Sequence, residues 1–168
     1  KFLMGWMSNW EYANVVPTEA WRSAMTVSRE IKLIKGTNSY RIAFTPADEL
    51  NAFKGIKFKK ENIEGSGELE IINSKQIDLA KAELKFNISD IKDKDLSFKL
   101  SNSRGDELLF GYEPSTNTFY VDRRKTGKVA FEERFASKVS TAPRTSSTKN
   151  LEGTILLDKT SIELFFDN

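Results

Sequence analysis

Apolar and polar residues alternate along much of this chain with a period of two, which is typical of β-strands. The alternation is clearest over residues 82–88 and 96–100, where every second side chain is apolar. Such a strand places one face on a core and the other in water, as in antiparallel sheets. On this pattern, strands are predicted at residues 2–8, 24–33, 40–44, 67–72, 82–88, 96–101, 107–112, 118–122 and 154–166.

Turn residues separate these predicted strands. Residues 102–106 read NSRGD and residues 114–117 read PSTN, and we expect the second run to close a β-hairpin. Residues 137–150, rich in Ser, Thr and Lys, predict a long exposed loop. Short strands with regular turn signals indicate an all-β protein with an antiparallel β-sandwich.

One short helix is predicted, over residues 45–53. Thr45 is the expected N-cap, and Pro46 would occupy the first helical position. No other stretch has a convincing helical period. We therefore expect this helix to serve only as a connector.

Composition excludes several classes of function. The chain has 26 Lys and Arg against 24 Asp and Glu, and its two basic runs, residues 57–60 and 123–125, are too short for a nucleic-acid interface. We interpret both runs as solvated faces. The absence of cysteine and histidine removes thiolate nucleophiles, histidine bases and the usual zinc ligands, so no metal and no cofactor are expected. No apolar run approaches the ~20 residues of a membrane span, and no membrane partner is expected.

All three tryptophans lie within the first 25 residues, at Trp6, Trp10 and Trp21. Polar side chains that can donate hydrogen bonds are interleaved with them, namely Asn9, Tyr12, Asn14 and Arg22. Aromatic faces beside hydrogen-bond donors suit a carbohydrate, whose C–H faces stack while its hydroxyls need partners. The alternative is that these aromatics are simply core or interface residues.

The order of residues in this block is specific. GWMSNWEYANVVPT followed by EAWRSAMTVSREIKL closely resembles the last propeller blade of the family 32 glycoside hydrolases, the invertases, levanases and inulinases that cleave β-fructofuranosidic bonds. Downstream, GDELLFGYEPSTNTFYVDRRKTGKVAF and ILLDKTSIELFFDN are similar to strands of that family's C-terminal β-sandwich, where YVDR-type and DxTSIE-type segments recur. Residues 34–105 match only in general pattern.

The resemblance implies two domains. Residues 1–33 would be a ribbon from the last blade of a five-bladed β-propeller, and residues 34–168 a C-terminal β-sandwich that lacks its final strands. An incomplete sheet would leave an open strand edge, and the ribbon would expose apolar surface. We therefore expect the chain to self-associate.

Catalytic residues are not expected in this chain. Members of the family carry the nucleophile in a WMNDPNG-like motif and the acid in an ECP-like motif, assisted by an RDP motif, and none of these strings occurs here. The chain alone is therefore predicted to be inactive. Glu11 is interpreted as a hydrogen-bonding partner within the blade, and Asp122 as a strand-end ion pair.

The resemblance assigns a substrate-binding role to one residue. Trp10 matches the tryptophan of the SNW(E/Q)Y segment, which lines the subsite for the fructosyl unit. Asn9 and Tyr12 flank it and are predicted to orient the site in the intact enzyme. Val15 falls where the family shapes the leaving-group side. Three further residues are interpreted as structural, namely Trp6, Trp21 and Arg22.

Three functions stay open. The first is a β-fructosidase of the levanase, inulinase or invertase type, acting on fructans or sucrose and secreted, periplasmic or held at the cell surface. The alternative is a non-catalytic carbohydrate-binding or structural sandwich, with a third reading as an oligomerisation module. An aromatic platform in that sandwich would use Tyr112, Phe119, Tyr120 and Phe131, although their alternation favours core packing. Substrate preference and endo or exo action are not encoded in these residues.

Overall fold

The structure is a computed structural model that describes residues 1–35, 39–73, 75, 77–91 and 93–167. Neighbouring strands pair antiparallel in β1–β2, β2–β3, β5–β6, β6–β7, β7–β8 and β9–β10. In these ranges no helix is long and apolar enough to cross a bilayer. The elements are β1 (Phe2–Leu3), β2 (Arg29–Lys35), β3 (Tyr40–Pro46), η1 (Asp48–Phe53), β4 (Ala82–Ile88), β5 (Leu96–Ser101), β6 (Glu107–Glu113), β7 (Thr118–Lys125), η2 (Glu133–Phe135), β8 (Ser140–Pro143), β9 (Leu151–Asp158) and β10 (Ser161–Phe166), where η marks a 3-10 helix.

The chain divides into two compact units, and each unit combines segments that are distant in sequence. Unit 1 comprises Lys1–Met4, Val27–Asn87 and Glu152–Asn168, and unit 2 comprises Gly5–Thr26 and Ile88–Leu151. Both units therefore contain part of residues 1–33, which we call the N-terminal block. The predicted domain boundary between residues 33 and 34 stays a prediction. The two units are groups of residues in contact, and such groups need not coincide with the domains of a family.

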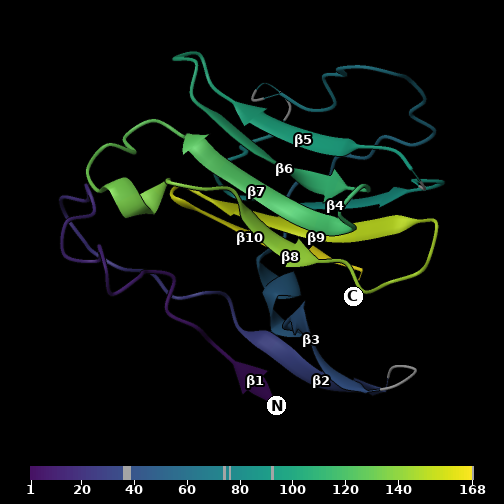
Figure 1. Cartoon of the computed structure of the whole chain (residues 1–168), viewed down its shortest axis with the longest axis horizontal. Coiled ribbons are helices and arrows are strands. Elements are labelled where there is room, and N and C mark those ends of the chain that lie inside the picture. The colour runs from purple at the N-terminus through teal and green to yellow at the C-terminus, as the bar shows by residue number, and fades with distance from the viewer. Residues whose placement is uncertain (36–38, 74, 76, 92, 168) are drawn as a thin grey trace. The chain divides into compact units, whose positions relative to one another are not determined.

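Unit 1 contains two three-stranded sheets, ordered β1-β2-β3 and β10-β9-β4 (Figure 1). Ile155 and Phe165 are buried in the second sheet, where Phe86 packs edge-on to Phe166 with ring centroids 5.5 Å apart. A Cβ at Gly153 would lie 2.6 Å from both rings, so glycine at this position lets the rings approach the strand. The single strand predicted at residues 154–166 is in fact a hairpin, since the chain turns between β9 and β10.

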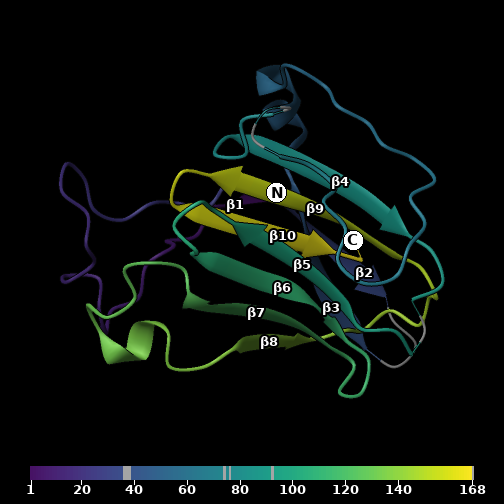
Figure 2. The ribbon, with the colours of Figure 1, turned by 90° about the horizontal axis from the view of Figure 1, so that it is seen from above.

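Unit 2 contains one four-stranded sheet, in which Figure 2 shows β5, β6, β7 and β8 side by side. Phe110 is fully buried and stacks on Phe98 of β5 at 5.3 Å. Beside it, a Cβ at Gly111 would lie 1.9 Å from the carbonyl oxygen of Leu96, so only glycine fits there. The turns predicted at residues 102–106 and 114–117 are confirmed.

Several local predictions are wrong. Residues 67–72 form no strand, and the strand predicted at residues 2–8 shortens to Phe2–Leu3 plus an isolated bridge between Trp6 and Met25. The strand predicted from residue 24 begins only at Arg29. Apolar composition promotes strand formation only where a partner strand satisfies the backbone, and these stretches lack enough paired neighbours within the described residues.

The predicted N-cap and the predicted loop also need correction. Thr45 and Pro46 end β3, where they pair with Glu30 and Arg29, and the 3-10 helix η1 follows Ala47 without a side-chain cap. Pairing with β2 thus overrides the local capping preference. The loop predicted at residues 137–150 contains β8, an exposed edge strand of four residues whose short, polar sequence gives no alternation signal.

Candidate functional site

Residues 9–13 form a tight turn in unit 2 that is held by Asn9. The backbone N–H groups of Tyr12 and Ala13 donate to the Asn9 carbonyl oxygen at 3.2 and 2.8 Å. The side-chain oxygen of Asn9 accepts from the N–H of Glu11 at 2.8 Å. This is an Asx turn, in which the side chain imitates a backbone acceptor. Asn9 therefore shapes the turn that carries Trp10.

Trp10 extends from this turn into solvent. Its side chain is 89% exposed, and its ring lies 4.9 Å from that of Trp6 at an angle of 57°. An exposed indole presents a flat apolar face on which a sugar ring can stack. Trp10 thus has an aromatic surface suited to the stacking role predicted for it, and that role stays a prediction.

Tyr12, only two residues further along, is 9% exposed and packs edge-on against Phe131 and Phe135, with ring centroids 6.3 and 5.4 Å away. Its hydroxyl accepts a hydrogen bond from Nη2 of Arg123 at 3.1 Å. The structure thus gives Tyr12 an anchoring position beneath the turn. Its predicted contribution to the substrate site stays a prediction.

Arg123 and Arg134 bind the two residues that follow Trp10. The guanidinium of Arg123 stacks over the Phe135 ring at 4.0 Å while it donates to Tyr12. Nη2 of Arg134 donates to the carbonyl oxygen of Glu11 at 3.0 Å, and Nη1 lies 3.7 Å from the Glu11 carboxylate. Figure 1 shows the η2 turn, which contains Arg134, beside the purple N-terminal segment.

The interpretation of residues 123–125 as a solvated face is therefore wrong for Arg123. Arg124 does follow it, with a side chain that is 55% exposed and paired to Asp122 at 2.7 Å. Alternation along β7 places these two arginines on opposite faces of the sheet. From the sequence, only this alternation could have indicated that Arg123 is partly buried, because its aromatic partners Tyr12 and Phe135 lie elsewhere in the chain.

A second contact to the N-terminal block lies in unit 1. Glu163 of β10 is only 6% exposed, and its Oε1 accepts from the backbone N–H of Val27 at 2.8 Å. Its Oε2 accepts from Nε and Nη2 of Arg29 at 3.2 and 2.5 Å. Arg29 also lies over the ring of Phe165 at 5.1 Å. A buried carboxylate is tolerated here because three donors satisfy it.

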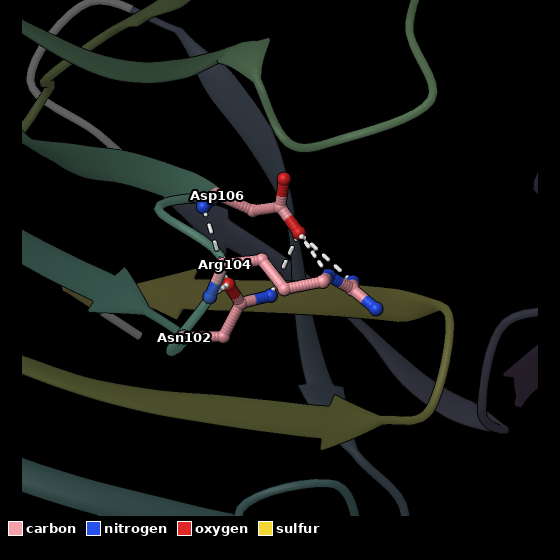
Figure 3. Close-up of polar contacts among 3 residues, drawn as sticks. All are labelled: Asn102, Arg104 and Asp106. Carbon is pink, nitrogen blue, oxygen red and sulfur yellow. Dashed lines mark hydrogen bonds and ion pairs between the residues drawn. The ribbon is translucent and has the colours of Figure 1, made fainter.

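Two acids of unit 2 are held ionised by local partners. Figure 3 shows Oδ2 of Asp106 accepting from Nδ2 of Asn102 at 2.8 Å and from Nε and Nη2 of Arg104 at 3.1 and 2.8 Å. The hydrogen bonds from Asn102 and then Arg104 lower the pKa of Asp106, and the Arg124 hydrogen bond lowers the pKa of Asp122. A general acid of glycoside hydrolysis needs a raised pKa instead. The predicted ion pair at Asp122 is confirmed.

The four aromatics considered as a sugar platform do not form one open surface. Tyr112 is buried beneath Arg144, and its hydroxyl donates to Oδ1 of Asn117 at 3.0 Å. Phe131 packs on Tyr12 and Phe135. Core packing, the favoured reading of their alternation, therefore accounts for these two side chains. Within the described ranges, no three acidic residues are grouped so that they could hold a metal ion.

Comparison with known families accounts for almost the whole chain. The family described as "Glycosyl hydrolases family 32 N-terminal domain" matches residues 1–46, and "Glycosyl hydrolases family 32 C terminal" matches residues 49–168. The second match alone covers more than half of the chain. The chain belongs to glycoside hydrolase family 32. The resemblance drawn from the tryptophan block and the two downstream motifs is confirmed.

Individual relatives agree with this assignment. A levanase of Bacillus subtilis (strain 168) is 31% identical over 163 residues, covering 96% of this chain and 24% of that protein. An extracellular exo-inulinase of Aspergillus niger is 27% identical over 167 residues, covering 96% of this chain and 30% of that protein. The crystal structure of exo-inulinase from Aspergillus awamori superposes with a TM-score of 0.76 at 24% identity, covering 98% of this chain and 32% of that one.

These matches confirm the predicted fold class, an all-β chain of the family's C-terminal β-sandwich type, and the N-terminal match over residues 1–46 supports the predicted propeller ribbon. The chain spans about a quarter to a third of the proteins it matches.

Proposed function

We propose that this chain is the last propeller ribbon and the C-terminal sandwich of a β-fructosidase that hydrolyses fructans or sucrose. The main support is that one uninterrupted chain matches both the N-terminal and the C-terminal regions of family 32. Relatives named levanase and exo-inulinase support a fructan as substrate. The hydrolytic carboxylates would lie on parts of the propeller outside the 168 residues of this sequence.

In this proposal, Trp10 stacks on the fructosyl unit while Asn9 and Tyr12 hold it in place. The exposed indole lies on a turn that is held by hydrogen bonds to Asn9 and from Arg123 and Arg134, which supports an apolar platform of defined orientation. The lowered pKa values of Asp106 and Asp122 argue against these two carboxyls as the general acid. The chain alone would then have no hydrolytic activity.

The test is fructose release from sucrose, levan and inulin by the full-length protein and by the 168-residue chain. The full-length protein should hydrolyse at least one of the three, and the chain alone none. Trp10→Ala in the full-length protein should lower kcat/KM about tenfold or more, corresponding to loss of roughly 1–3 kcal/mol of aromatic contact. Trp21→Ala, a second exposed tryptophan interpreted as structural, is the matched control and should change kcat/KM less than Trp10→Ala.

Absence of fructose release by the full-length protein on all three substrates would contradict the proposal. Tight binding of levan or inulin by the 168-residue chain, measured by calorimetry, would instead favour the carbohydrate-binding alternative.

We further propose that the protein acts outside the cytoplasm, in a secreted, periplasmic or surface-bound form, because several relatives are named extracellular. Cell fractionation with an antibody against this chain would test the location. Recovery of the protein only in the cytoplasmic fraction would contradict it.

Self-association of the chain is also proposed. Leu33 and Ile42 face each other across β2 and β3, and both are exposed together with Tyr40 on the same face of the sheet. An apolar patch of this kind favours pairing with a second copy. Sedimentation equilibrium should show a species heavier than 19.1 kDa, and a double substitution to Ser at Leu33 and Ile42 should reduce association. A strictly monomeric chain at high micromolar concentration would contradict this.

A further inference from the structure

Arg123 occupies a position between two aromatic side chains of unit 2. Its guanidinium lies 4.0 Å from the centre of the Phe135 ring, and its Nη2 donates to the hydroxyl of Tyr12 at 3.1 Å. The stacking fixes the plane of the guanidinium, and the hydrogen bond then fixes the Tyr12 ring. The sequence separation between Arg123 and Tyr12 is 111 residues, so this is a tertiary contact and not a local one.

Tyr12 in turn determines where the turn of residues 9–13 lies. Tyr12 and Ala13 are the buried residues of this turn, whereas Asn9, Trp10 and Glu11 are exposed. The backbone of Tyr12 is bonded on both sides, because its N–H donates to Asn9 and its carbonyl oxygen accepts from Val15 at 3.0 Å. A displacement of the Tyr12 ring would therefore move the backbone that carries Trp10.

We propose that Arg123 is a positioning residue for the reaction: through Tyr12 it holds the Asn9–Trp10–Glu11 turn, and so the indole of Trp10, in the orientation that receives the sugar. The inference rests on the proposed function, because it gives Trp10 its substrate. Arg123 itself touches no substrate and acts only through Tyr12. It lies in the YVDR segment of β7, so this motif gains a role in the placement of a propeller residue.

Arg134 supports the same turn but less firmly. Its contacts reach the exposed backbone and carboxylate of Glu11, and about half of its own side chain is exposed. Such a contact competes with water and contributes little. Arg123, stacked on a ring and bonded to a buried hydroxyl, is the stronger determinant of the position of Trp10.

A double-mutant cycle in the full-length enzyme tests this inference. Arg123→Met should lower kcat/KM for the preferred fructoside about fivefold, and Arg123→Lys, which keeps a cation but not the planar stack, should recover only part of the loss. In the Trp10→Ala background, Arg123→Met should lower kcat/KM by less than about twofold, since the residue through which it acts is already gone. Arg124→Met, its exposed neighbour paired with Asp122, is the matched control and should leave kcat/KM unchanged.

Equal losses from Arg123→Met with and without Trp10 would overturn the inference, because a residue that only stabilises the fold acts independently of Trp10. If Arg123→Met fails to fold, Tyr12→Phe decides the matter instead. It removes one hydroxyl from a ring that stays packed, and it should show the same dependence on Trp10. Additive behaviour of Tyr12→Phe would also overturn the inference.

A readout without catalysis separates this inference from the proposed function. In the 168-residue chain, Trp6→Phe and Trp21→Phe leave Trp10 as the sole tryptophan. Arg123→Met should then lower the fluorescence anisotropy of Trp10, and Arg124→Met should not. A fall in anisotropy without fructosidase activity in the full-length protein would support the positioning and remove the proposed function. Unchanged anisotropy would overturn the positioning whatever the activity.

Discussion

Two tertiary contacts bind the N-terminal block to strands from the C-terminal half, and they differ in kind. In unit 1, the carboxylate of Glu163 meets the backbone of Val27 and the guanidinium of Arg29, with sequence separations of 136 and 134 residues. In unit 2, the guanidinium of Arg123 meets a neutral hydroxyl and an aromatic ring. We call these the Glu163 contact and the Arg123 contact.

The difference lies in what remains when one partner is removed. Arg29 is only 25% exposed, so loss of the Glu163 charge would leave a cation that water hydrates poorly. The Arg123 contact, as described above, involves a hydroxyl and two rings and no carboxylate. Removal of the Arg123 side chain therefore leaves only uncharged groups behind. The Glu163 contact is therefore suited to fixing structure, and the Arg123 contact to fixing orientation.

Glu163→Gln should have the largest effect on stability. The amide keeps an acceptor for the N–H of Val27 but turns a neutral group toward Arg29, which should cost about 2–3 kcal/mol of unfolding free energy. Urea denaturation followed by circular dichroism would measure the change. Glu152→Gln, an exposed glutamate on the adjacent strand β9, is the matched control and should stay within about 0.5 kcal/mol.

If Glu163→Gln and Glu152→Gln proved equally mild, the Glu163 carboxylate would be hydrated and the contrast between the two contacts would fail. A cycle with Arg29→Met would then locate the error, because a tight pair gives a double variant that is less destabilised than the sum of the single variants.

Arg123→Met should have the next largest effect on stability. Loss of the stack over Phe135 and of the hydrogen bond to Tyr12 should cost about 1–2 kcal/mol together. Tyr12→Phe should cost about 1 kcal/mol, because it removes only the hydrogen bond. Thermal unfolding of the two variants and of Arg124→Met would rank them. A cost for Arg124→Met equal to that of Arg123→Met would remove the distinction between the two faces of β7.

The strands with regular alternation of apolar and polar residues were predicted well from the sequence. Alternation and turn residues were sufficient for β5, β6 and β7 and for the turns between them, because each of these elements pairs with its neighbour in sequence. The strand predicted at residues 67–72 was wrong, since apolar composition does not reveal whether a partner strand exists. The edge strand β8 was missed because nothing in Ser-Thr-Ala-Pro alternates.

The candidate site was predictable only in part. The family resemblance singled out Asn9, Trp10 and Tyr12, but it predicted neither the turn that Asn9 forms nor the exposure of the Trp10 indole. Arg123 and Glu163 lie inside the two motifs that carried the resemblance, yet their contacts could not be derived from sequence. Each binds a residue more than 100 positions away, and no local periodicity encodes such a pairing.

The partly buried ion pairs of Glu83 with Lys54 and Lys85 should have a smaller effect on stability, and that effect should depend on pH. Glu83 of β4 lies 2.7 Å from Nζ of Lys54 and 3.1 Å from Nζ of Lys85. Burial raises the pKa of Glu83, but hydrogen bonds from Lys54 and Lys85 outweigh it, so the pKa falls below its ordinary value of 4.5. A lowered folded pKa means that this stabilisation is present above the unfolded pKa and is lost as pH falls through the folded pKa.

Glu83→Gln should therefore flatten the decline of stability on acidification. Between pH 6 and 3, the variant should lose a few tenths of a kcal/mol less than the unmodified chain, because Lys85 is 65% exposed and water screens the pair. Melting temperatures across this range would measure the difference, and Glu64→Gln, an exposed glutamate of the same unit, is the control. A steeper decline in Glu83→Gln would mean that the lysines do not favour the ionised carboxylate.

The smallest effect should come from the contacts in Figure 3, which join residues no more than four apart. Asn102 and Arg104 lower the pKa of Asp106 but do so at the surface, so neither should contribute to global stability as the Glu163 and Arg123 contacts do. Asn102→Ala removes the hydrogen bond with the largest influence and should raise the pKa of Asp106, which carbonyl-carbon NMR titration would measure directly. The midpoint of urea denaturation should hardly change. A large loss of stability in this variant would show that a local polar contact can matter as much as a tertiary one, and the distinction between the two classes of contact would have to be abandoned.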